Sequence, residues 1–126
     1  MISDNGQLSK PRVLVVDDER VIADTLATIL NQNGFEASAV YTGAEAVARA
    51  RTSRPDLVIS DVIMQDMNGI EAAIRIRQSL PGCKILLFSG QAATADLLEK
   101  ARAQGHEFEI LAKPVHPQDL LAKLRT

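Results

Sequence analysis

The sequence predicts an α/β protein whose doubly wound, five-stranded parallel sheet carries helices on both faces. Two observations lead to this prediction: short apolar runs recur five times, and a stretch with helical spacing of its apolar residues follows each run. Continuous apolar runs are typical of strands that are buried on both faces, as in parallel sheets. Strands that alternate with helices along the chain favour a parallel sheet with right-handed crossovers.

The predicted strands share short runs of β-branched or aliphatic residues, and we expect them at residues 13–16, 35–40, 57–59, 84–88 and 108–112. The helices between them have recognisable ends. Asn33-Gly34 stops the first helix. Thr42 and Glu45 are spaced as a capping box that opens the second helix. Pro117 suits the first turn of the last helix.

The length and composition indicate one globular domain. The 126 residues fit a polar, flexible tail at residues 1–10 and a single domain at residues 11–126. A net charge of -2 and a sequence pI near 5.6 disfavour direct binding to nucleic acid or to an anionic membrane. A single cysteine, Cys83, excludes an internal disulfide framework and a thiolate zinc cluster. The apolar runs are too short to span a bilayer, so a cytoplasmic location is expected.

Charged or chemically reactive side chains directly follow the predicted strands. They are Asp17 and Asp18 after the first strand, Asp61 after the third, Ser89 at the end of the fourth and Lys113 after the fifth. The carboxyl ends of parallel strands meet at one edge of the sheet, where ligands bind. Three carboxylates at one edge repel one another unless a hard divalent cation such as Mg²⁺ relieves the conflict. Such a crevice suits phosphoryl transfer to an aspartate nucleophile.

Four motifs carry a family resemblance. They are VLVVDDE at residues 13–19, DVIMQDMNG at residues 61–69, Ser89-Gly90 and Lys113-Pro114. In this order, each at the end of a predicted strand, they resemble the receiver domain of two-component response regulators, of the chemotaxis-regulator type. The resemblance runs from about residue 11 to residue 124. It implies a flavodoxin-like fold with the strand order 2-1-3-4-5.

The resemblance also implies a magnesium-dependent phosphoacceptor site. Asp61 matches the phosphorylated aspartate and is also a metal ligand. Asp18 would bind Mg²⁺ directly and Asp17 through a water molecule. Ile63 would offer its backbone carbonyl to the metal. These assignments follow from the positions of the residues in the matching motifs.

The remaining matches concern the phosphoryl group and its partners. Ser89 matches the hydroxyl residue that follows the phosphoryl group, and Lys113 matches the lysine that pairs with it. The peptide bond between Lys113 and Pro114 is expected to be cis. The family role implies a histidine kinase or a histidine phosphotransfer protein as donor, an unknown downstream protein, and room for a phosphorylation-dependent homodimer. The domain would be no enzyme beyond self-catalysed phosphotransfer and autodephosphorylation.

Three positions depart from the family pattern. Gln65 stands where proline is common, which predicts a less rigid loop after Asp61. Ile110 replaces an aromatic residue before the lysine, and Val115 replaces another after the proline. We therefore expect conformational coupling to run through the backbone at residues 90–94 and through repacking near Phe108, and not through residue 110.

Two other functions compete with the phosphorylatable switch. A pseudo-receiver would be marked by the loss of a site residue, and none is lost. A flavodoxin-like cofactor binder would need hydroxyl-rich or glycine-rich phosphate donors after the first strand, where Asp17-Asp18 would repel phosphate. His106 and His116 lack partners at metal-ligand spacing. No output domain follows Thr126, so a free-standing receiver and a piece of a longer protein both remain open.

Overall fold

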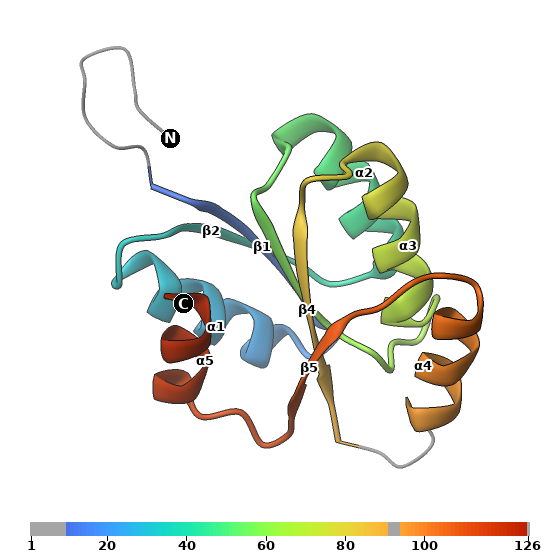
Figure 1. Cartoon of the computed structure of the whole chain (residues 1–126). Coiled ribbons are helices and arrows are strands. Elements are labelled where there is room, and N and C mark those ends of the chain that lie inside the picture. Colours follow the sequence, from blue (N-terminus) through green and yellow to red (C-terminus); the bar gives the residue numbers. More distant parts are fainter. Residues whose placement is uncertain (1–9, 91–93, 126) are drawn as a thin grey trace.

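The computed structural model describes residues 10–90 and 94–125, and all but Lys10 of the expected tail lies outside this part. Its five strands form one parallel sheet in the order β2-β1-β3-β4-β5, as predicted (Figure 1). The strands are β1 (Arg12–Val16), β2 (Glu36–Val40), β3 (Leu57–Asp61), β4 (Lys84–Ser89) and β5 (Glu109–Ala112). The helices are α1 (Arg20–Asn31), α2 (Gly43–Ser53), α3 (Gly69–Ser79), α4 (Thr94–Ala103) and α5 (Pro117–Leu124).

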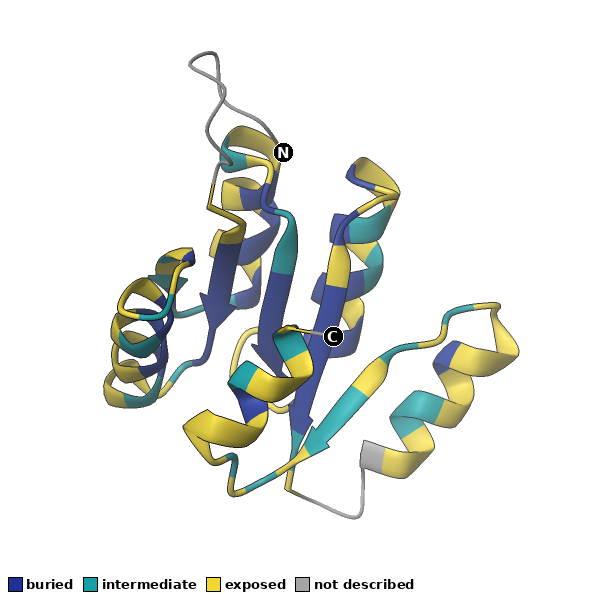
Figure 2. Ribbon diagram, turned by 60° about the vertical axis from the view of Figure 1, so that its left-hand side comes forward, coloured by how far each residue is buried: buried dark blue, intermediate teal, exposed yellow. Residues whose placement is uncertain are grey.

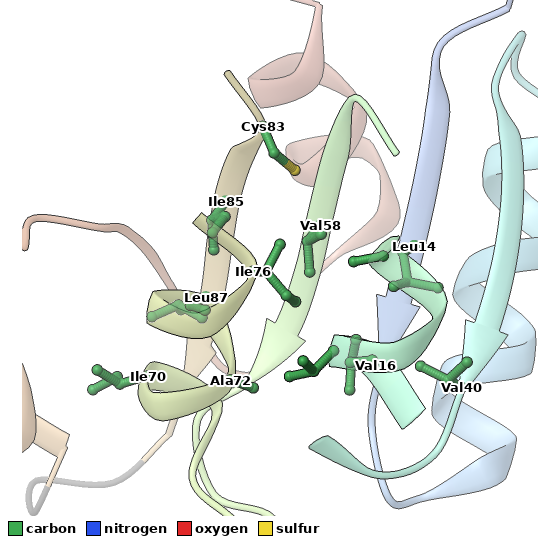
Figure 3. Packing of buried hydrophobic residues seen from close by; sticks show 14 of the residues in the cluster. Leu14, Val16, Val40, Val58, Ile70, Ala72, Ile76, Cys83, Ile85 and Leu87 are labelled. Carbon is green, nitrogen blue, oxygen red and sulfur yellow. The ribbon is translucent and has the colours of Figure 1, made fainter. Parts of the chain in front are cut away.

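Helices cover both faces of the sheet, and alternate residues of each central strand face opposite layers. On β1, Leu14 and Val16 join the larger core cluster, which packs the sheet against α2, α3 and α4. Val13 and Val15 join the second cluster, which packs the sheet against α1 and α5. Figure 3 shows the larger cluster. Burial on both faces explains why the predicted strand is apolar without alternation.

Burial falls off towards the β5 edge of the sheet. Figure 2 shows buried residues concentrated in the central strands, whereas β5 is intermediate or exposed along its length. The fifth strand also begins one residue later than predicted, at Glu109. Phe108 precedes the strand, and the guanidinium carbon of Arg77 lies 4.4 Å from the centroid of the Phe108 ring. This contact with α3 explains why Phe108 packs on the core outside the strand ladder.

The predicted helix ends agree with the structure in most places. The Thr42 hydroxyl accepts a hydrogen bond from the Glu45 amide at 3.0 Å and so caps α2. Gly34 takes a φ of +92°, which a residue with a Cβ rarely adopts. The second helix, α2, ends at Ser53, and Arg54 closes it in a left-handed conformation. Within the described residues, no helix has the length and apolar character needed to cross a membrane.

Candidate functional site

Three carboxylates meet at the carboxyl edge of the two central strands. Asp17 and Asp18 follow β1, and Asp61 is the last residue of β3. Val16 is paired with Ser60 in the parallel ladder, so the next residues, Asp17 and Asp61, are brought side by side. One carboxylate oxygen from each of the three residues lies within 4.8 Å of the others. The cluster expected from the strand ends is therefore present.

Backbone amides contact all three of these carboxylates from the loops around them. The Glu19 amide donates to Oδ1 of Asp17 at 3.0 Å, and the Gln65 amide donates to Oδ2 of Asp18 at 3.3 Å. The Ile63 amide lies 3.4 Å from Oδ1 of Asp61. The loop between β3 and α3 thus reaches two of the three acids, and it also carries the Ile63 carbonyl.

Lys113 provides the positive charge of the cluster. Its Nζ lies 2.9 Å from Oδ2 of Asp61 and 4.0 Å from Oδ2 of Asp17. Burial alone would lower the pKa of Lys113, but the hydrogen bond and charge of Asp61, with the charge of Asp17, outweigh it and raise the pKa. The peptide bond from Lys113 to Pro114 is cis, as expected. Lys113 therefore stays protonated and neutralises part of the acidic charge.

Asp17 is the most buried of the three acids. It is 1% exposed, and its Oδ2 is buried without a hydrogen-bond partner among the described residues. Burial raises its pKa, the amide of Glu19 lowers it, and the nearby charge of Asp61 raises it further. Burial therefore contributes more to the raised pKa of Asp17 than the repulsion between carboxylates that the sequence indicated. An orphaned carboxylate oxygen beside two other acids fits a hard divalent cation, which prefers oxygen ligands and keeps several waters.

The structure places the other expected residues at the same edge. Ser89 ends β4, and its carbonyl accepts the Lys113 amide at 2.9 Å, so the ends of β4 and β5 are joined beside the acids. Ile63 lies in the loop after Asp61 with its side chain 40% exposed. Of the segment expected to transmit a change, residues 91–93 lie outside the described part of the chain. No histidine joins the acidic cluster in residues 10–90 and 94–125.

Two residues near the site were not singled out from the sequence. A Cβ on Gly69 would overlap the carbonyl group of Asp61, so only glycine lets α3 start this close to the acid. Asp66, in the loop between β3 and α3, accepts hydrogen bonds from the backbone amides of Gly43 and Ala44. The run DVIMQDMNG contains both residues, but only the folded chain shows which backbone groups they meet.

A model of the response regulator receiver domain matches residues 13–125. The chain belongs to this family. Receiver domains of two-component response regulators are phosphoacceptor signalling domains, so the strand edge with Asp61 and Lys113 is the place where this role is to be sought. The family resemblance inferred from the four motifs is confirmed.

The related proteins include both short and long regulators. The receiver is 33% identical to the chemotaxis protein CheY of Thermotoga maritima over 90% of this chain and 93% of that protein. It is 30% identical to the DNA-binding response regulator MtrA of Mycobacterium tuberculosis over 92% of this chain and 50% of that protein. The chain spans about half the length of the first curated relatives it matches.

Solved structures agree with the topology. A CheY-like response regulator receiver domain protein from Methanospirillum hungatei superposes with a TM-score of 0.83 and 29% identity, covering 93% of this chain and 92% of that one. The chemotaxis response regulator CheY4 of Vibrio cholerae superposes with a TM-score of 0.79 and 31% identity, covering 93% and 98% of the two chains.

Proposed function

We propose that Asp61 accepts a phosphoryl group from a histidine kinase or a histidine phosphotransfer protein in a magnesium-dependent reaction. The observation that carries this proposal is the position of Asp61, which lies within 4.8 Å of two further acids and 2.9 Å from Lys113. One oxygen of Asp61 bonds to phosphorus as the phosphorus–nitrogen bond of a phosphohistidine breaks. The imidazole leaves, and Asp61 becomes an acyl phosphate.

Asp17, Asp18, Asp61 and the backbone carbonyl of Ile63 would hold Mg²⁺. When bound, the cation supplies charge neutralisation for the transferred oxygens. The Oδ2 of Asp17 supports this assignment, because it is buried without a hydrogen-bond donor, and the Lys113 ammonium group at 4.0 Å is too far away to supply one. Asp18, which is half-exposed at the mouth of the cluster, leaves room for water on the same ion.

Lys113 and Ser89 would act on the phosphoryl group itself. Once Asp61 is phosphorylated, the Lys113 ammonium group can pair with a phosphoryl oxygen in place of the carboxylate oxygen it now contacts. The Ser89 hydroxyl, at the end of the neighbouring strand, would donate to another phosphoryl oxygen. Autodephosphorylation would then consist of attack by water on phosphorus, with release of inorganic phosphate and return of the Asp61 carboxylate.

The proposal extends to the domain and its partners. Residues 11–126 would form the receiver behind a tail at residues 1–10, in a cytoplasmic protein. A downstream protein would read the phosphorylated state, and phosphorylation would also allow a homodimer. The receiver itself would not contact nucleic acid or membrane. Relatives named as DNA-binding regulators are about twice as long as this chain, so the output of any longer protein lies outside the receiver.

The test is to treat the protein with acetyl phosphate and Mg²⁺ and to map the added phosphoryl group by mass spectrometry. The label should appear on Asp61, and Asp61→Asn should take up none, because an amide is not a nucleophile. Lys113→Ala should still bind magnesium but should respond weakly to phosphorylation. A label on another residue of the wild type would contradict the assignment of Asp61. Failure of folded, magnesium-loaded wild type to be labelled would favour a pseudo-receiver.

A further inference from the structure

The loop between β3 and α3, residues 62–68, links the acids to the rest of the fold. Its Gln65 amide contacts Asp18, and its Ile63 amide approaches Asp61. Any movement of this loop therefore changes the geometry around two acids at once. The position of this loop therefore depends on its contacts with the rest of the protein.

Asp66 supplies two such contacts. Its Oδ1 accepts the Gly43 amide at 3.0 Å, and its Oδ2 accepts the Ala44 amide at 2.9 Å. Both amides belong to the first turn of α2, more than 20 residues away in the sequence. The Gly43 amide, followed by the Ala44 amide, lowers the pKa of Asp66, so the carboxylate is fully charged at neutral pH.

The first turn of α2 also fits the loop sterically. A Cβ on Gly43 would overlap the side chain of Met67, the residue after Asp66. The helix and the loop therefore touch through the Asp66 carboxylate and through the Met67 side chain. Figure 1 shows α2 and α3 lying side by side, with this loop leading into α3.

Asp66 supplements the local cap of α2. Thr42 already occupies the N-cap position of α2, and its hydroxyl accepts the Glu45 amide. Asp66 engages two different amides of the same turn from another part of the chain. Thr42 leaves the Gly43 and Ala44 amides without a partner, so the Asp66 bonds both satisfy the start of α2 and tie the loop to it.

We infer that Asp66 is a positioning residue for the magnesium site: its two bonds to the start of α2 hold the loop from which residues 63 and 65 reach the acids. This inference rests on the proposed function, in which Asp17, Asp18 and Asp61 bind Mg²⁺. The coupling is reciprocal, so magnesium that favours the ordered loop also favours the Asp66 contacts with α2.

The test is a magnesium titration of the apo protein, followed by NMR at the backbone amides of Asp18 and Ile63. Asp66→Ala should weaken magnesium binding by about tenfold, the lower end of what removal of a supporting residue costs a metal site. Asp66→Asn keeps one acceptor oxygen and should give a smaller loss. It also keeps the test decisive if the alanine variant does not fold.

Thr42→Ala is the matched control. It removes the local cap of the same helix turn and should lower the melting temperature, yet it should leave the magnesium dissociation constant within twofold of the wild-type value. In the wild type, magnesium should slow hydrogen exchange at the Gly43 and Ala44 amides more than at Glu45. Equal magnesium affinity of Asp66→Ala and the wild type would overturn the inference, as would equal losses in Asp66→Ala and Thr42→Ala. Absence of magnesium binding by the wild type would instead refute the metal site itself.

Discussion

The β1–β3 edge and the C-terminal flank, which comprises α4, β5 and α5, are built differently. At the β1–β3 edge, strands covered on both faces end in acids held by backbone amides, and Asp17 and Asp61 are buried. In the flank, β5 has no buried residue, and α5 has one among the described residues, Leu120. The three acids therefore lie at the well-packed centre of the sheet, whereas Lys113 comes from the less buried flank, whose looser packing suits a change of state.

The bonds within the flank reinforce this difference. An exposed ion pair of 3.0 Å joins Lys123 on α5 to Glu109 on β5. The Arg77 guanidinium group covers Phe108 from α3. Exposed ion pairs of this kind contribute about 0–1 kcal/mol. These surface contacts therefore add little to the stability of the flank.

The largest expected effect comes from removing matched side chains from the two regions. Ile59 on β3 is fully buried, whereas Ile110 on β5 is only partly buried. Ile59→Ala should lower the free energy of unfolding by about 4 kcal/mol, near the upper part of the range for a buried isoleucine. Ile110→Ala should cost about 1–2 kcal/mol, because less apolar area is lost. Urea denaturation measures both, and equal losses would remove the contrast between the regions.

Part of this contrast is visible in the sequence. The run Val13 to Val16 predicts a strand buried on both faces, and the acids that follow it predict a shared edge. The Asp66 bonds could not be predicted, because they join residues 22 and 23 positions apart through a contact that only the packing of α2 against the loop creates. The orphaned oxygen of Asp17 and the position of Phe108 outside β5 likewise depend on tertiary neighbours.

A smaller effect is expected from neutralising the most buried acid. The folded-state pKa of Asp17 lies above its value of 3.8 in the unfolded chain, chiefly because of burial. Its contribution to stability is complete below that unfolded value and is lost as the pH rises through the folded-state pKa. Asp17→Asn should therefore raise the melting temperature of the metal-free protein at pH 7 and change it less at pH 4.

The control for this prediction is Glu71→Gln, which neutralises an exposed acid on α3 away from the cluster. This variant should show no such dependence on pH. If Asp17→Asn destabilised the metal-free protein at neutral pH, the view that the β1–β3 edge is held in an electrostatically costly state would be wrong.

A bound cation should relieve the electrostatic cost of the acidic cluster, and melting curves recorded with and without magnesium test this directly. A ligand that binds only the folded state stabilises it by about 1.4 kcal/mol at a concentration roughly tenfold above its dissociation constant. The account predicts that millimolar magnesium raises the melting temperature of the wild type and of Glu71→Gln, and that Asp18→Asn loses most of this gain. A wild-type melting curve unchanged by magnesium would contradict the account.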